Sequence, residues 1–442
     1  MKSDPSGGIA LRQAFQDVAC PVCGCVCDDL TVTVEDGRIT AVEPPCPLAE
    51  PWFLAQHAGH PPARIAGCPV ELDAAVAEAA SILRGARAPL IYGLSRSSTG
   101  GQRAAVRLAD LLGATIDTTA SRCHGPSIMA LQEVGESTCT LGEIRERADL
   151  VIYWGVDPLE SHPRHLQRYA VEPLGRWVPR GRDDRRLVVV DVRPTATAGR
   201  ADKFLQIAAG RDLEVLWTLR AIVRGLAVDP RYDAGAPLAE LRQLADWMAS
   251  CRCGVVFFGL GLARLASGHR DVEALLRLVR DLNGITRFHA RRMRVPGDVA
   301  GADSVLCWQT GFPFSVNLAR GYPRYNPGEY SANELLARRE ADACLLVGSE
   351  GVVDLSDNAR THLQSIPIMV LDYPSVESPW EPAVRFTTGV HGVHLPGTAY
   401  RMDEVPIPLR PVVPSPYPSD EDVLREIIQR LRPAATADAP PA

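Results

Sequence analysis

The sequence predicts an α/β protein in which a small cysteine-rich N-terminal domain precedes two related Rossmann-like halves with parallel sheets. Three observations carry this prediction. Short apolar strands alternate with helical patterns from about residue 88, one strand-turn-helix unit occurs twice, and five of the twelve cysteines lie between Cys20 and Cys46. A chain of 442 residues is long enough for two or three domains. We expect domains at 1–65, 66–230 and 231–410, with a C-terminal helix and a disordered tail over 411–442.

Composition and charge narrow the class of protein. Hydrophobic residues make up 46% of the chain and charged residues 23%, as in ordinary globular α/β proteins. The formal net charge of −6 argues against a nucleic-acid partner. No run approaches the ~20 apolar residues of a membrane span, and the polar N-terminus lacks the apolar core of a secretory signal. We therefore expect a cytoplasmic protein with no nucleic-acid ligand and no membrane span.

The N-terminal cysteines define the first element. They form a Cys-x2-Cys-x3-Cys run followed by one distant cysteine, and the four are Cys20, Cys23, Cys27 and Cys46. Four thiolates are what a cubane [4Fe-4S] cluster requires, and a tight glycine-containing loop can aim three of them inward. The apolar stretches 30–34 and 38–42, joined by Glu-Asp-Gly, predict a hairpin that returns the chain to supply the fourth. The spacing therefore favours an iron-sulfur cluster.

Alternatives remain for this cysteine group. Four cysteines can also bind zinc tetrahedrally, although zinc knuckles more often use two Cys-x2-Cys pairs. Cys25 lies among the expected ligands and could replace Cys23 or Cys27 only with an altered loop, so we treat it as a bystander. Other cysteines in apolar or isolated positions are interpreted as buried, inert thiols.

The rest of the chain contains an internal duplication. A strand, a Gly-Leu turn, an arginine and an amphipathic helix occur in both 89–119 and 254–289. Two further matches follow in the same order, and they are 148–157 with 341–351 and 186–194 with 366–374. All βαβ units share some likeness, but three matches in register favour duplication. A duplicated β/α unit predicts two related ligand sites at the carboxyl ends of the strands, on either side of a pseudo-twofold axis.

A second candidate centre is the segment 121–127, Ser-Arg-Cys-His-Gly-Pro-Ser, which follows the first β/α unit. Its loop is expected to face the ligand crevice between the halves. The thiolate of Cys123 could ligate a soft metal there, with the imidazole of His124 available for proton transfer. Taken alone, a Cys-His pair is weak evidence, and a packed loop is the alternative.

Five longer motifs extend this interpretation to a family. They are CPVCGCVCDDL, SRCHGPSIMALQEVG, ADLVIYWGVDPLESHPRH, WQTGFPF and RGYPRYNPGE. Together they resemble the B subunit of formylmethanofuran dehydrogenase, which is the molybdopterin or tungstopterin subunit of that complex. The resemblance runs from about residue 18 to residue 408. It implies the parallel-sheet fold of the formate dehydrogenase and DMSO reductase type.

The resemblance also implies a redox activity in one-carbon metabolism. Such a subunit interconverts CO2 and formate at a tungsten or molybdenum atom held by two pterin guanine dinucleotides and one cysteine, which Cys123 matches. His124 matches the neighbouring proton-handling histidine, and the four N-terminal cysteines match the ligands of an electron-relay [4Fe-4S] cluster. The expected partners are the other subunits of a formylmethanofuran dehydrogenase or formyltransferase/hydrolase complex and a ferredoxin-like electron carrier.

Polar residues at strand ends are the expected pterin contacts, because glycine-rich strand ends and donors to phosphate should surround the dinucleotides. The residues at suitable places are Gly155, Asp157, His162 and Arg164 in the first half, and Gly348 with Asp372 in the second. Asp191 and Asp372 could accept from guanine or pterin amines, or could merely cap a loop. Arg320 and Arg324, in a polar loop, are interpreted as ligand or interface residues.

Arg294 and the residues after it bear on whether the chain is active. Arg294 matches the arginine near the substrate in this family, where a guanidinium would stabilise developing negative charge. The next four residues are Val-Pro-Gly-Asp, where the family predicts a Gly-His-Tyr-Asn type of segment. This departure favours a second hypothesis, a scaffold without redox chemistry in a bacterial formyltransferase/hydrolase complex. A generic formate dehydrogenase is disfavoured, because no room remains after about residue 408 for its final pterin-binding barrel.

Overall fold

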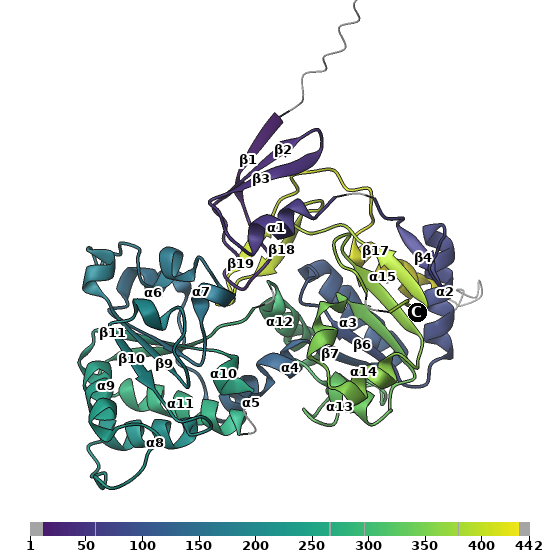
Figure 1. Cartoon of the computed structure of the whole chain (residues 1–442). Coiled ribbons are helices and arrows are strands. Elements are labelled where there is room, and N and C mark those ends of the chain that lie inside the picture. Colours follow the sequence, from purple (N-terminus) through teal and green to yellow (C-terminus); the bar gives the residue numbers. More distant parts are fainter. Residues whose placement is uncertain (1–11, 58, 265–266, 296, 379, 433–442) are drawn as a thin grey trace, which may run out of the picture.

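The structure is a computed structural model that describes residues 12–57, 59–264, 267–295, 297–378 and 380–432. Two α/β lobes lie beside each other, and a small N-terminal sheet stands above the junction between them (Figure 1). The predicted disordered tail falls mainly on 433–442, outside the described residues. Among the described residues, no helix combines the length and the apolar character needed to cross a membrane.

The N-terminal residues form an antiparallel three-stranded sheet. Its strands, in spatial order, are β1 Arg12–Val18, β2 Leu30–Glu35 and β3 Arg38–Glu43, and helix α1 Ala49–Leu54 follows. The predicted hairpin is confirmed as β2 and β3, and alternate side chains of β2 are buried because one face of the sheet covers the core. Four cysteines lie in the loop between β1 and β2, and Cys46 follows β3. The hairpin thus returns the chain to this loop.

The first lobe is built on a parallel five-stranded sheet. Its strands, in spatial order, are β10 Lys203–Gln206, β9 Arg186–Asp191, β8 Leu150–Trp154, β11 Cys253–Phe258 and β12 Arg287–Arg292. Helices on one face are α8 Asp212–Val223, α9 Leu238–Ser250 and α11 Gly268–Leu282. Leu150 and Ile152 pack against these helices, whereas Val151 and Tyr153 pack toward the N-terminal cysteines. Both faces are buried, which explains the continuous apolar runs in the sequence.

The second lobe is built on a nine-stranded sheet with a parallel centre. Its strands, in spatial order, are β14 Arg324–Tyr325, β13 Val316–Asn317, β7 Thr115–Thr118, β6 Pro89–Gly93, β15 Ala343–Val347, β16 Ile368–Asp372, β17 Val384–Thr387, β4 Ala63–Ile65 and β5 Cys68–Pro69. Helices on one face are α2 Leu72–Gly85, α3 Thr99–Leu112, α12 Val299–Thr310 and α15 Asp420–Leu431. On the other face are α13 Ala332–Ala337 and α14 Asp357–Leu363. The predicted α/β class with parallel sheets is confirmed.

The duplicated units are present in space, but they are assembled crosswise. The second lobe holds the strand order β7-β6-β15-β16-β17, and the first lobe holds the matching order β12-β11-β8-β9-β10. Each sheet therefore takes one unit from the first half of the chain and one from the second. The predicted division into 66–230 and 231–410 does not follow the sheets, because β6 pairs with β15 and β8 pairs with β11.

The remaining elements are short. They are α4 Ala120–Cys123, α5 Gly125–Val134, α6 Leu141–Arg147, α7 Pro158–Ser161, α10 Leu260–Ala263, the hairpin β18 Gly397–Tyr400 and β19 Pro406–Leu409, a π-helix Leu166–Ala170, and 3-10 helices Gly181–Asp184, Ala198–Arg200 and Ser349–Asp354. The hairpin β18–β19 contacts both the N-terminal loop and the first lobe. The amide of Met402 donates to the Gly24 carbonyl at 2.8 Å, and Arg291, in β12, donates to the Met402 carbonyl.

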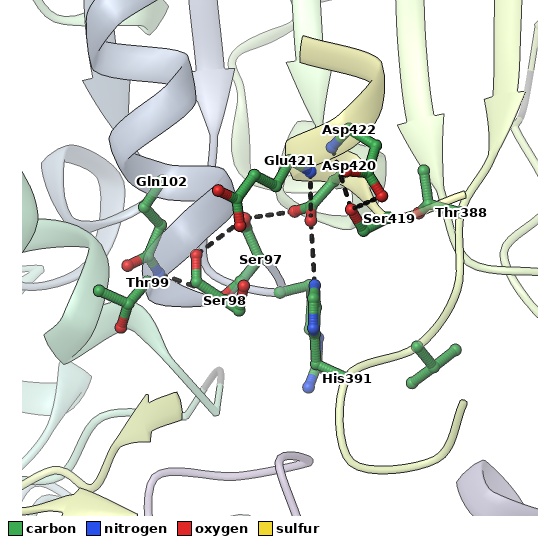
Figure 2. A network of polar contacts seen from close by, with 12 residues as sticks. Ser97, Ser98, Thr99, Gln102, Thr388, His391, Ser419, Asp420, Glu421 and Asp422 are labelled. Atoms are coloured by element: carbon green, nitrogen blue, oxygen red, sulfur yellow. Dashed lines mark hydrogen bonds and ion pairs between the residues drawn. The ribbon is translucent and has the colours of Figure 1, made fainter. Parts of the chain in front are cut away.

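Helix α15 is attached through its N-terminal turn (Figure 2). The carboxylate of Asp420 accepts from the hydroxyl of Ser97, at the start of α3, and pairs with Nε2 of His391 at 2.9 Å. The Ser419 hydroxyl caps the helix by accepting from the Asp422 amide at 3.0 Å. Histidine lies at the end of this chain of contacts rather than between serine and aspartate, so the group is not a hydrolase triad. It instead joins three chain segments.

Candidate functional site

A cavity of about 260 Å³, here called the central cavity, opens between the carboxyl ends of the two sheets. Residues that follow strands of both lobes line it, among them Cys123, His124, Met293 and Gly348. Parallel strands end on the same edge of a sheet, so loops that are distant in the chain meet there. The predicted location of 121–127 at the crevice is where the structure puts Cys123 and His124.

Cys123 lies at the end of α4 and is partly exposed to the cavity. Enclosure by protein raises the pKa of its thiol to about 11, despite the opposing charge of Arg294. At neutral pH this thiol is therefore protonated and a poor nucleophile. A bound cationic metal would displace the proton, because metal ligation requires the thiolate. The setting therefore disfavours a nucleophilic cysteine and is compatible with a metal ligand.

His124 is buried and fixed at both ring nitrogens. Its Nε2 lies 3.2 Å from the Met293 carbonyl, and its Nδ1 lies 3.2 Å from the Ser127 hydroxyl. A carbonyl can only accept, so Nε2 carries the hydrogen, and Nδ1 carries the lone pair that accepts from the Ser127 hydroxyl. Burial, followed by the charge of Arg294, lowers the pKa of His124 well below its usual value. The imidazole is therefore neutral and has one nitrogen that can take up a proton.

Arg294 lies behind Cys123 and is not part of the cavity wall. Its side chain is 2% exposed and is paired with the buried carboxylate of Asp303, which also accepts from Thr118 Oγ1 at 2.8 Å. Burial lowers the pKa of Arg294, but the Asp303 charge outweighs burial and the net pKa is raised. The guanidinium thus stays charged and acts on Cys123 through space.

The N-terminal loop gathers five thiols, which we call the five-cysteine loop: Cys20, Cys23, Cys25, Cys27 and Cys46. All five are buried and line one small cavity of about 10 Å³. Soft thiolates are the donor set that an iron-sulfur cluster requires, and the four expected ligands are among them. Within the part of the chain that the structure describes, no three histidine, cysteine or acidic side chains are grouped to hold a single metal ion.

The five-cysteine loop is hydrogen-bonded directly to the wall of the central cavity. The Gly24 amide donates to the Val295 carbonyl at 3.1 Å, and Val295 itself lines the cavity. Arg96, on the opposite wall, donates to the carbonyls of Pro21 at 3.0 Å and Val22 at 2.9 Å. One amide hydrogen bond and one arginine therefore separate the loop from the cavity.

The unexpected segment after Arg294 fits this contact. Gly297 packs against the Pro21 carbonyl, with no space for a Cβ. Asp298 accepts from Gln102 Nε2 at 2.7 Å and from the Tyr400 amide at 2.5 Å. The change from the family pattern is therefore compatible with an intact packing of the loop against the cavity wall.

Three residues predicted to bind a cofactor have hydrogen-bond partners within the chain. The Asp157 carboxylate accepts from four donors in 159–197, the Leu159 and Ala196 amides and the Thr197 amide and hydroxyl. His162 is buried, with Nε2 2.9 Å from the Arg294 carbonyl. Arg164 borders the five-cysteine loop and forms two hydrogen bonds to Asp29, at 2.8 and 2.7 Å. Arg164 thus positions the loop, His162 the segment after β12, and Asp157 the turn at 196–197.

Other predicted cofactor residues lie at strand ends as expected, but they differ in how much of each is already in contact with the chain. Gly348 lines the central cavity at φ +82°, a conformation that favours glycine. Gly155, at φ +58°, packs directly against Gly261. Both oxygens of Asp372 already accept from Ser349, at 2.8 and 2.7 Å, whereas Asp191 is half-buried at the end of β9. Asp191 is therefore the freer acceptor.

Arg320 and Arg324 are not among the residues that line the central cavity. Arg320 is exposed, and Arg324 lies in β14 at the edge of the nine-stranded sheet, with its guanidinium over the Tyr330 ring. Two other arginines, Arg96 and Arg264, do line the cavity, although the sequence motifs did not single them out. Each follows a Gly-Leu turn of the duplicated unit, so this shared arginine was the signal that could have identified them.

These two arginines are held by one short element. Arg96 pairs with Glu350 at 2.7 Å and Arg264 pairs with Asp354 at 2.8 Å. Both carboxylates belong to the 3-10 helix Ser349–Asp354, and both line the central cavity. The equivalent arginines of the two repeats thus both contact the 3-10 helix Ser349–Asp354 at the central cavity.

Comparison with known proteins identifies the family. No family profile matches the chain. The B subunit of tungsten-containing formylmethanofuran dehydrogenase 2 from Methanocaldococcus jannaschii is 38% identical over 430 residues, 95% of this chain and 99% of the relative. This chain belongs to the family of formylmethanofuran dehydrogenase B subunits. The protein of the same name from Methanococcus maripaludis is 35% identical over 429 residues, with the same coverage. The resemblance found in the sequence is confirmed.

Further relatives of this formylmethanofuran dehydrogenase homologue define its fold. The B subunit of the formyltransferase/hydrolase complex Fhc from Methylorubrum extorquens is 29% identical over 285 residues, 64% of this chain and 74% of the relative. A chain of the FhcABCD crystal structure from that organism, in complex with methylofuran, matches with TM-score 0.68 and 26% identity over 84% of this chain and 98% of that one. Acetylene hydratase from Pelobacter acetylenicus, at 14% identity and TM-score 0.66 over 94% of this chain and 69% of that one, shares the fold.

Proposed function

We propose that this chain interconverts CO2 and formate within a C1-transfer complex, at a tungsten or molybdenum atom held by two pterin guanine dinucleotides and by Cys123. One arrangement carries the proposal. Cys123 and His124 line a cavity between the carboxyl ends of both sheets, and a backbone hydrogen bond joins that cavity to the five-cysteine loop. Two tungsten-containing relatives that match nearly the whole chain support it.

The residues around the cavity have distinct roles. The bound metal would supply the two-electron redox chemistry. The neutral imidazole of His124 takes up or releases a proton at Nδ1, because Nε2 is committed to the Met293 carbonyl. Arg294 acts as a positioning residue, since its buried charge favours the Cys123 thiolate and negative charge in the cavity. Cys123 would ligate the metal.

The two duplicated arginines are candidates for the phosphates of the dinucleotides. A guanidinium binds carboxylate and phosphate with the same paired geometry. In the structure both arginines are paired with carboxylates: Arg96 with Glu350 at 2.7 Å and Arg264 with Asp354 at 2.8 Å. A central cavity of about 260 Å³ is below the usual range for ligands of drug size, so the binding of two dinucleotides requires the cavity to widen.

The five-cysteine loop would hold the electron-relay cluster through Cys20, Cys23, Cys27 and Cys46. Its contact with Val295 gives a short connection to the central cavity. A ferredoxin-like carrier would deliver or remove electrons, and the remaining subunits of the complex would handle the carbon substrate. The cysteine, pterin and metal roles form one electron path from a partner protein to the cavity.

A second candidate function is a scaffold without redox chemistry in a formyltransferase/hydrolase complex. The structural match to the FhcABCD chain, which covers 98% of that chain, favours it. So does the departure at 295–298 from the sequence pattern expected for dehydrogenases. Under this hypothesis the cysteines and the central cavity would be retained without a metal-pterin group.

Metal and pterin analysis of the complex purified from its native host decides between these functions. The dehydrogenase proposal predicts tungsten or molybdenum together with pterin, iron at about four per chain, and formate oxidation with a viologen dye. Replacement of Cys123 by alanine should remove one protein ligand of the tungsten or molybdenum and abolish formate oxidation, while leaving iron in place. A complex that holds neither metal nor pterin, yet transfers formyl groups, would establish the scaffold function instead.

A further inference from the structure

Tyr92 is a buried tyrosine whose hydroxyl has no hydrogen-bond partner among the residues that the structure describes. It lies near the carboxyl end of β6, and its side chain is 1% exposed. A buried hydroxyl gives up its hydrogen bonds to water on folding, and proteins rarely leave such a group unsatisfied. The hydroxyl therefore destabilises the free chain, and its presence calls for a use.

The duplicated unit shows that packing does not require this hydroxyl. Tyr92 precedes the Gly-Leu turn of the first unit, and Phe258 precedes the same turn of the second. Phe258 is fully buried at the end of β11, so a phenyl ring satisfies the equivalent position. The ring of Tyr92 belongs to an apolar cluster with residues of α13 and of the 3-10 helix Ser349–Asp354. The ring accounts for the packing, and the hydroxyl is additional.

The hydroxyl lies directly behind the wall of the central cavity. Gly351, within the 3-10 helix Ser349–Asp354, lines this cavity. A Cβ on Gly351 would lie 3.6 Å from Tyr92 Oη and 2.7 Å from Cγ2 of Thr119, which also lines the cavity. The Tyr92 hydroxyl thus contacts a wall residue that has no side chain to cover it.

The 3-10 helix is a thin part of this wall. Val353, within it, is 74% exposed, so one side of the helix faces solvent. A 3-10 helix also has poorer hydrogen-bond geometry than an α-helix. The cavity must widen to bind the proposed dinucleotides, and this thin segment is where we expect it to widen. A shift of Gly351 would bring the Tyr92 hydroxyl into the cavity wall.

The surroundings favour a phosphate as the group that this hydroxyl meets. Glu350 and Asp354, on either side of Gly351, pair with Arg96 and Arg264. These two arginines are the proposed phosphate partners, and Tyr92 lies behind the segment that both of them contact. A phenol hydroxyl can donate to a phosphate oxygen, and a hydrogen bond to a charged acceptor is stronger than one between neutral groups.

We propose that Tyr92 is a ligand-binding residue of the central cavity: its hydroxyl donates a hydrogen bond to a phosphate oxygen of a bound pterin dinucleotide. The inference rests on the proposed function, which supplies the dinucleotide. It adds a donor that lies behind the cavity wall of the free chain. The hydroxyl that is unsatisfied in the free chain is then paired when the ligand binds.

The test is Tyr92→Phe, which removes the hydroxyl and keeps the ring. The full chain, produced in a host that makes no pterin dinucleotide, should have a Tm equal to or above that of the wild type, because no hydrogen bond is lost. In the complex loaded with cofactor, pterin should be released about tenfold to hundredfold faster, the effect of one hydrogen bond to a charged group. Fluorescence of the oxidised pterin follows the release.

Tyr153→Phe is the matched control. Tyr153 is a buried tyrosine of β8 whose hydroxyl lies 2.8 Å from Nδ1 of His165, and it is not among the residues that line the central cavity. Its loss should lower the Tm and leave pterin release at the wild-type rate.

Two results would overturn the inference. A lower Tm for Tyr92→Phe without cofactor would show that the hydroxyl already has a partner in the free chain. A wild-type rate of pterin release from Tyr92→Phe would show that the hydroxyl does not reach the ligand. Both leave the proposed function standing, whereas a wild-type complex without pterin removes the proposed function together with this inference.

Discussion

The amide of Gly24 donates to the carbonyl of Val295 at 3.1 Å, and this bond joins the five-cysteine loop to the wall of the central cavity. The approach is close because Gly24 has no side chain. A Cβ at this position would overlap the Arg294 carbonyl. The loop and the cavity are therefore held at a spacing that only glycine permits.

Gly24→Ala should separate the loop from the cavity wall. We expect a loss of about 1–3 kcal/mol in stability, typical of overpacking, visible as a lower Tm of the purified chain. Gly85→Ala is the matched control, because a Cβ there meets no atom within 4 Å and Gly85 is not left-handed. A Tm for Gly24→Ala equal to that of the control would contradict the close contact.

The buried pair of Arg294 and Asp303 should be sensitive to loss of one partner. Asp303→Asn leaves a buried guanidinium without its counter-charge, which costs about 3–5 kcal/mol. Denaturant unfolding measures this loss, and Glu340→Gln, in an exposed pair with Arg338, should cost under about 1 kcal/mol. Similar losses in both variants would argue against a special role for the buried pair.

Stability should fall as pH rises above neutrality, because of His391. Burial lowers the pKa of His391, but the charge and hydrogen bond of Asp420 outweigh burial, so the net pKa is raised. A raised histidine pKa stabilises the fold fully below the unfolded value of about 6.5, and this contribution is lost as pH rises through the folded pKa. Asp298 acts in the same direction, since burial raises its pKa to about 8 and the folded chain retains its proton longer.

The measurement is Tm against pH for the wild type and for His391→Gln. The variant should be less stable near pH 6 and should show a shallower fall from pH 6 to 9. Asp298 still titrates in the variant, so part of the slope remains. Parallel curves for the two proteins would show that His391 does not carry the pH dependence.

Loss of His124 should affect turnover more than metal binding. His124→Ala removes the proton acceptor and should lower the rate of formate oxidation by about 10²–10⁴-fold, with tungsten or molybdenum still bound. Ser127→Ala removes only the hydroxyl beside Nδ1 and should have a much smaller effect. Equal losses in both variants, or release of the metal from His124→Ala, would point to a structural role.

Local sequence patterns predicted the strands and the hairpin, whereas the pairing of strands within each sheet depends on packing between distant segments. Alternating apolar residues identified the hairpin of β2 and β3, and the repeats identified equivalent strands. The sequence also located Cys123 and His124 at the crevice, because the carboxyl ends of parallel strands are predictable. Which copies share a sheet was not predictable, since the pairing of β6 with β15 depends on contacts about 250 residues apart.

For the site residues, too, local pattern predicted the position in the chain but not the contacts made with distant segments. Asp157, His162 and Arg164 follow the pattern of ligand-binding strand ends, but local donors and Asp29 already satisfy them. Spacing alone cannot show such partners, because they come from other segments. Arg96 and Arg264 were visible only as a repeated arginine, and their approach to one cavity required the crosswise assembly.

The crosswise assembly sets an order for folding during synthesis. All five strands of the first lobe are complete once residue 292 has emerged, whereas the sheet of the second lobe lacks β15, β16 and β17 until after residue 387. The strands of the first lobe can therefore pair before β15, the partner of β6 in the second lobe, has been synthesised. A nascent chain stopped after β12 would hold all five strands of the first lobe, but only β6 and β7 of the parallel centre of the second, so the apolar edge of β6 would still lack β15.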